Sequence, residues 1–60
     1  PAEAAEFASL LGRVVAPAGR RWVVEVTTLA GRPVVLAEQR PAAMTGGPLL
    51  DRARVTFDAP

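Results

Sequence analysis

The chain is 60 residues long and contains neither cysteine nor histidine. A domain of this length buries only about 60% of the surface that its unfolded form exposes, so small domains usually gain stability from disulfides, a metal or an oligomeric partner. Here disulfides are impossible, and so is a metal site built on thiolate or imidazole ligands. The few carboxylates are scattered without calcium-loop spacing, and we therefore expect no metal and no cofactor.

Half of the residues are apolar, which is more than a small interior can hide. A disordered segment would be less apolar and more highly charged. We therefore expect a second burying surface, provided by a homo-oligomer, by a protein partner or by the rest of a longer chain. We predict a single small domain over residues 1–60, and either a subunit or an excised piece of a longer chain is compatible with this prediction.

The net charge is +1, with seven arginines and no lysine, so the high isoelectric point does not indicate a strongly basic surface. The usage of alanine, arginine, glycine, proline and valine is typical of a GC-rich genome, and we expect a bacterial source. No apolar run approaches the about 20 residues of a membrane span, and no signal-peptide pattern is present. We therefore expect a cytoplasmic protein that does not contact membranes.

Residues 2–11 have the pattern of a helix. Glu3 suits the positive end of the helix dipole. The spacing of Phe7, Leu10, Leu11 and Val14 gives one apolar stripe. The pattern allows two positions for the C-terminal end of this helix. The helix either stops at Gly12 in a left-handed conformation, or it continues through residues 13–15 and stops before the proline at position 17. The stripe favours the longer helix.

Three strands follow in the pattern. Residues 21–29 and 33–38 are joined by a tight turn at Ala30-Gly31, after a first turn over residues 17–19. The second strand is apolar on both faces, which predicts a central or doubly covered position. Residues 52–58 alternate between apolar and polar side chains, as in an antiparallel sheet that is open on one side.

We predict an α+β fold, with the N-terminal helix packed on a small three- or four-stranded, mainly antiparallel sheet. If residues 13–16 form a strand, the sheet has four strands and curls towards a small SH3-like barrel with an N-terminal helix. The predicted core is made of large apolar side chains. These are Phe7, Leu10, Leu11, Trp22, Val24, Val26, Leu36, Val55 and Phe57.

The residues that most enzyme mechanisms need are missing. Histidine, cysteine, lysine and tyrosine are all absent, which removes Ser–His pairs, Cys–His pairs and Schiff-base lysines. Ser9 lies in the middle of the predicted helix, where a small hydroxyl is structural. A free amine at Pro1 could act as a base, as in the small tautomerases, but those families begin with a strand and this chain begins with a helical pattern. We predict a protein without catalytic residues.

The segment 39–51 contains the candidate interface. Two prolines and two adjacent glycines break regular structure there, and loops of this length in small domains are often binding loops. Met44, Leu49 and Leu50, together with the strand residue Val35, are the predicted interface residues. The main expectation is a non-catalytic protein-interaction or oligomerisation module, an accessory subunit or domain that docks on another polypeptide.

Arginines give the alternative of nucleic-acid binding. Arg20 and Arg21 precede Trp22, and Arg52 and Arg54 share the polar side of the last strand; such a set can contact phosphates and stack a base. Because the tryptophan is in phase with the apolar side of its strand and the net charge is low, solvated arginines at strand ends are favoured over nucleic-acid contacts.

A family pattern supports the same alternative. The stretch Phe7–Val14, followed by Val26-Thr27 and by Gly31–Val34, resembles the prevent-host-death antitoxins, in which a helix with a leucine pair and Arg-Val precedes a short hairpin carrying Gly-Arg/Lys-Pro-Val. The resemblance covers residues 5–38. It implies a dimer that binds operator DNA and neutralises a toxin through a C-terminal segment. The family's opening strand and C-terminal helical tail have no counterpart in this chain.

Overall fold

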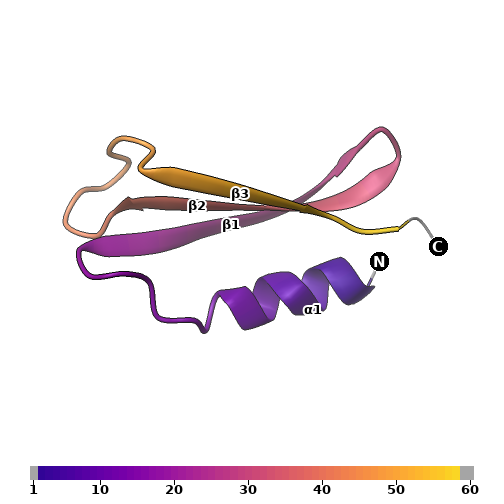
Figure 1. Cartoon of the computed structure of the whole chain (residues 1–60), viewed down its shortest axis with the longest axis horizontal. Helices are drawn as coiled ribbons and strands as arrows, with labels where there is room; N and C mark the ends of the chain where they lie inside the picture. Colours follow the sequence, from indigo (N-terminus) through magenta and orange to yellow (C-terminus); the bar gives the residue numbers. More distant parts are fainter. Residues whose placement is uncertain (1, 59–60) are drawn as a thin grey trace.

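The computed structural model describes residues 2–58, which form one helix and one open three-stranded sheet. The helix packs against β1 and β2, and the antiparallel strands follow the order β1-β2-β3 (Figure 1). The α+β prediction is therefore confirmed, and the barrel alternative is wrong. The bounds of the elements are α1 Ala2–Leu11, β1 Arg20–Leu29, β2 Arg32–Pro41 and β3 Asp51–Thr56. The catalytic hypothesis for Pro1 lies outside the described residues.

The helix ends at Leu11, so the longer of the two predicted helices is wrong. The Gly12 N–H still donates to the Ala8 carbonyl, but the Arg13 and Val14 N–H groups bond the carbonyls only three residues back, at 3.0 Å each. Glycine costs about 1 kcal/mol in a helix interior, and β-branched residues lose side-chain freedom there. Gly12 does not adopt a positive φ, so the predicted left-handed cap is also wrong.

The β1–β2 hairpin has a two-residue turn. Ala30 and Gly31 have φ angles of 53° and 78°, the pair of positive values that a type I′ turn requires. Leu29 and Arg32 close the turn as paired residues. The hairpin prediction is confirmed, and the strands are longer than predicted: β1 begins one residue earlier and β2 runs three residues further, to Pro41.

The pairing register divides the sheet into two faces. Paired residues of antiparallel neighbours point to the same side, and successive residues alternate. We call one side the arginine face and the other the valine face. The arginine face carries Arg21, Val23, Glu25, Thr27, Leu29, Arg32, Val34, Leu36, Glu38, Arg40, Arg52, Arg54 and Thr56; the valine face carries Arg20, Trp22, Val24, Val26, Thr28, Pro33, Val35, Ala37, Gln39, Pro41, Asp51, Ala53 and Val55.

The core is smaller than predicted and lies on the central strand. Five apolar residues are buried among residues 2–58, one on the helix and four on β2: Ala4, Pro33, Val34, Val35 and Ala37. Of the predicted core, Leu10, Val26 and Val55 are exposed to 61, 47 and 37%, so these three assignments are wrong. The other six are half-buried: Phe7, Leu11, Trp22, Val24, Leu36 and Phe57.

An aromatic pair joins the helix to the C-terminal end of the sheet. The rings of Phe7 and Phe57 meet edge-on, with centroids 5.7 Å apart, a geometry that adds to simple burial. Ala4 is the one residue of α1 that is fully buried. The helix therefore buries only a small part of its surface.

The turn at Ala30 yields a stability prediction. An alanine at positive φ costs about 1 kcal/mol, whereas asparagine tolerates this region and favours type I′ turns. We expect Ala30→Asn to raise the free energy of unfolding by about 0.5–1 kcal/mol in chemical denaturation. Ala18→Asn is the control, because Ala18 has no positive φ. An equal gain from both substitutions would contradict the assignment of the gain to the turn.

Candidate docking surface

The hydrogen-bonding phase of β3 follows from one contact at its end. The Phe57 N–H donates to the Pro33 carbonyl at 2.8 Å, and the register pairs Val55 with Val35 and Ala53 with Ala37. In an antiparallel ladder, the residues of one strand direct their N–H and C=O groups alternately towards and away from the neighbour. The odd positions of β3 therefore bond β2, and the even positions point outward. Because proline has no N–H, the ladder ends at this pair.

The outer edge of β3 is open. All six residues of the strand are exposed, and the helix contacts β1 and β2 but not β3. In Figure 1, β3 forms the border of the sheet on the side away from α1. The Arg52 N–H is occupied by the Asp51 carboxylate at 2.8 Å. Among the described residues, the outward N–H groups of Arg54 and Thr56 have no partner.

Exposed leucines lie beside this edge. Leu49 and Leu50 directly precede β3 and are exposed to 43 and 42%. The third loop residue, Met44, is also exposed. Val35 is only 1% exposed and belongs to the chain's own core. The structure therefore brings two of the four predicted interface residues next to the strand edge. We call Leu49–Thr56 the β3 edge.

The register places three of the four predicted nucleic-acid residues on one face. Arg21, Arg52 and Arg54 lie on the arginine face, whereas Arg20 lies on the valine face. The Arg20 Nη1 donates to Gln39 Oε1 at 2.9 Å. The arginine face also carries two arginines that the sequence reasoning did not select. Its charged residues are the five arginines 21, 32, 40, 52 and 54 and the two glutamates 25 and 38.

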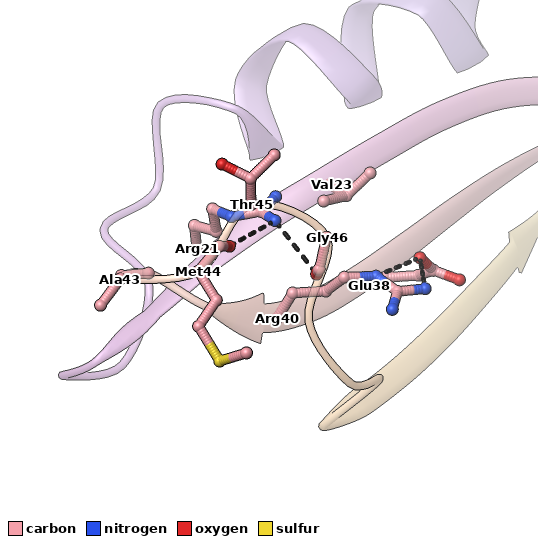
Figure 2. A pocket seen from close by; sticks show the side chains of 9 residues that line it. Arg21, Val23, Glu38, Arg40, Ala43, Met44, Thr45 and Gly46 are labelled. Atoms are coloured by element: carbon pink, nitrogen blue, oxygen red, sulfur yellow. Dashed lines mark hydrogen bonds and ion pairs between the residues drawn. The ribbon is translucent and has the colours of Figure 1, made fainter.

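Two of these arginines hold the loop that follows β2, and Figure 2 shows the contacts of Arg21 with this loop. Arg21 Nη2 donates to the Met44 and Gly46 carbonyls at 3.2 and 3.3 Å, and Arg40 Nη1 donates to the Gly47 carbonyl at 2.8 Å. Both glycines have positive φ, which lets the loop turn its carbonyls towards the guanidinium groups. The loop thus lies over one end of the arginine face.

A hollow of about 570 Å³ lies between this loop and the sheet. It is lined by Arg21, Val23, Glu38, Arg40, Ala42, Ala43, Met44, Thr45 and Gly46. Its guanidinium groups are already bonded to carbonyls of the loop and to a carboxylate. The polar groups of the hollow therefore stabilise the conformation of the loop, and we do not place a ligand there.

Glu38 joins two neighbouring arginines. Its Oε1 accepts from Arg40 Nη2 at 2.9 Å, and its Oε2 accepts from Arg52 Nη2 at 3.0 Å. The hydrogen bond from Arg40, and then that from Arg52, lower the pKa of the Glu38 carboxyl below its ordinary value of 4.5. Sequence reasoning missed both Glu38 and Arg40, because residues 38–40 are three consecutive polar residues without the alternation that would indicate a longer second strand.

The valine face has a smaller hollow next to β3. It measures about 110 Å³ and is bounded by Trp22 on β1 and by Asp51 and Ala53 on β3, with Ala37 and Gln39 between them. The alanines create it, because a larger side chain at either position would fill the space. Trp22 Nε1 is buried and has no hydrogen-bond partner among the described residues. A shallow depression with both apolar and polar walls therefore adjoins the open strand.

Comparisons leave the function to be argued from this geometry. The chain matches no family model, and no curated protein or solved structure matches it significantly. Residues 2–58 contain no helix with the length and apolar character needed to cross a bilayer. Within the same residues, no three carboxylates lie close enough together to hold a metal ion.

The lowered pKa of Glu38 predicts a dependence of stability on pH. A carboxyl whose pKa is lower in the folded than in the unfolded chain stabilises the fold above its unfolded pKa, and that contribution is lost as the pH falls through the folded value. Glu38→Gln removes the charge. We therefore expect the variant to melt at a lower temperature than the wild-type chain at about pH 7 and the difference to shrink at about pH 2.5.

Glu25→Gln is the matched control, because Glu25 lies on the same face but forms no ion pair among the described residues. Thermal unfolding followed by circular dichroism gives both melting temperatures. A Glu38→Gln deficit that stays constant over the whole pH range would contradict the assigned ion pairs.

Proposed function

We propose that this chain is a non-catalytic docking module that binds an extended segment of another polypeptide as a fourth strand along β3. The observation that carries the proposal is the open β3 edge, where all six residues of the strand are exposed and the outward backbone groups have no partner among residues 2–58. Strand addition is a general mode of peptide recognition, in which main-chain hydrogen bonds give affinity and alternate side chains give specificity.

The apolar surface supports a partner. The accessible surface of the chain is 4204 Å², whereas a compact monomer of 6.3 kDa exposes roughly 3,700 Å². The molecule is elongated, with extents of 38 × 21 × 14 Å. Leu49, Leu50 and Val55 contribute to this surface at the β3 edge itself. A docked strand would remove part of this apolar area from water and thereby stabilise the complex.

A second copy of the chain fits this edge poorly. If the β3 strands of two copies pair antiparallel, the two sheets join into one, and the arginine faces of both copies lie on the same side of it. Arg52 and Arg54 of one copy then lie opposite or diagonal to the same residues of the other copy. Like charges directly opposite one another destabilise a strand pair, and charged residues on an edge are a common protection against self-pairing. The proposal therefore names a different polypeptide as the occupant.

This repulsion predicts that the arginines keep the chain from self-association. We expect the double variant Arg52→Thr, Arg54→Thr to form dimers or larger species at concentrations at which the wild-type chain is monomeric. Sedimentation velocity measures both. The control is Arg13→Thr, because Arg13 follows the helix and lies outside the sheet. Self-association of the wild-type chain and the double variant to the same extent would contradict the protective role.

The ladder phase predicts which proline is tolerated on β3. Thr56→Pro removes an outward N–H, so it should leave the melting temperature within a few degrees of the wild type, as edge prolines do. Val55→Pro removes an N–H that bonds β2, and we expect it to lower the melting temperature far more. Peptides selected from a random library against the wild-type chain should lose at least about tenfold in affinity for Thr56→Pro, as one main-chain hydrogen bond and the approach of the strand are lost.

Amide chemical shifts locate the binding. The selected peptides are expected to shift the NMR signals of Arg54 and Thr56 more than those of the hairpin residues Leu29 and Arg32. Selected peptides that shift β3 amides in the wild type and bind Thr56→Pro unchanged would contradict strand addition. A return of no binding peptides would count against the docking role as a whole.

Nucleic-acid binding is the second candidate, and the five arginines of one face favour it. Its support is weaker, because Arg21 and Arg40 are bonded to the loop and Arg52 is paired with Glu38. Phosphate contacts at these positions would compete with bonds that already exist. The antitoxin-like dimer, which the resemblance implies, belongs to the same candidate and is distinguished by the experiment below.

A further inference from the structure

We infer that the segment which docks on β3 carries acidic residues at alternate positions with an apolar residue between them. This inference rests on the proposed strand addition and concerns the chemistry of the partner. It starts from the cross-strand rows of the arginine face. One row runs Val23–Glu38–Arg52 across the three strands, and the next runs Glu25–Leu36–Arg54.

The two arginines of β3 differ in their inner neighbours. Arg52 lies beside Glu38 and is paired with it at 3.0 Å. Arg54 lies beside Leu36, which offers no charge, and it forms no ion pair within residues 2–58. Its nearest carboxylate in the row, Glu25, is two strands away. The positive charge of Arg54 is therefore left for a group on the outer side of β3.

An added strand would bring a side chain to that side. Residues directly opposite on neighbouring antiparallel strands have Cβ atoms about 4.5–5.5 Å apart. The bond between Glu38 and Arg52 shows that a carboxylate and a guanidinium meet across neighbouring strands on this same face. A glutamate or aspartate opposite Arg54 would repeat this pair, and a second acid two positions along would face Arg52.

The valine face sets the residue between the two acids. A side chain directed to that face would lie beside Ala53 and Val55, at the rim of the hollow bounded by Trp22 and Ala53. Both β3 side chains are apolar, and Val55 is 37% exposed. An apolar residue of the partner would cover them. The resulting pattern, acidic–apolar–acidic, reads the same in both directions and so fits a parallel or an antiparallel strand.

Three capped peptides of about eight residues, long enough to span β3, test the inference. In the first, glutamate and valine alternate; in the second, lysine replaces every glutamate; in the third, the residues of the first are rearranged into a glutamate block and a valine block. Amide shifts at Arg54 and Thr56 and the emission of the single tryptophan report binding. We expect the alternating acidic peptide to bind at least about tenfold more tightly than the other two, and less tightly as salt rises.

A charge-reversal substitution tests which arginine binds the acidic side chain of the peptide. We expect the Arg54→Glu variant to lose its affinity for the alternating acidic peptide and to bind the lysine peptide more tightly than the wild-type chain does. The matched control is Arg32→Glu, because Arg32 lies on the same face at the hairpin end of β2 and not on β3. It should leave the preference unchanged. An identical effect of both reversals would show a general response to net charge and would overturn the assignment to Arg54.

The outcomes separate the inference from the function on which it rests. If all three peptides shift the β3 amides with similar affinity, strand addition stands and the acidic pattern is wrong. If none of them does, while library-selected peptides bind elsewhere or not at all, the proposed function fails as well. If a DNA duplex or an RNA strand at low salt binds the arginine face more tightly than any peptide, nucleic acid is the partner and both proposals are overturned.

Discussion

The pairing of β2 along both of its edges is the constraint on which the rest of the structure depends. Val34 and Val35 point to opposite faces of this strand, and both are buried. The helix, the hairpin and β3 all find their places by contact with it. Because β2 uses both edges, β1 and β3 are the borders of the sheet. The helix lies against β1 and leaves β3 uncovered. An open edge is thus a consequence of having one helix and three strands.

The local elements could be predicted from the sequence because short-range chemistry determines them. Two residues between alternating runs specify a hairpin, and Gly31 supplies one of the two positive φ angles that such a turn needs. The alternation in β1 and β3 correctly gave the faces of Trp22 and Val55. The end of the helix was harder to predict, since the apolar stripe through Val14 and the helix-breaking effect of Gly12 point to different answers.

The core could not be predicted with the same accuracy, because alternation tells which residues share a face but not how much of that face is covered. Val26 and Val55 flank Val35 in register, yet only the central residue is buried. Which neighbours stay exposed depends on where a ten-residue helix lies on the sheet. The candidate site was limited in the same way. Leu49 and Leu50 were selected as apolar loop residues, but the pairing of Glu38 with Arg52 requires the register between strands.

The arginines of β3 give the open edge two properties that would otherwise conflict. An unpaired strand flanked by leucines attracts any extended chain, including another copy of itself. In the proposed docking mode, Arg52 and Arg54 oppose that copy by like charge and favour a segment whose acids match their spacing. Specificity often rests on such a repulsive element as much as on new attraction. Since Glu38 already pairs with Arg52, Arg54 contributes most of the unpaired charge in the proposed docking mode, and its identity would then have the larger influence on which strands join the sheet.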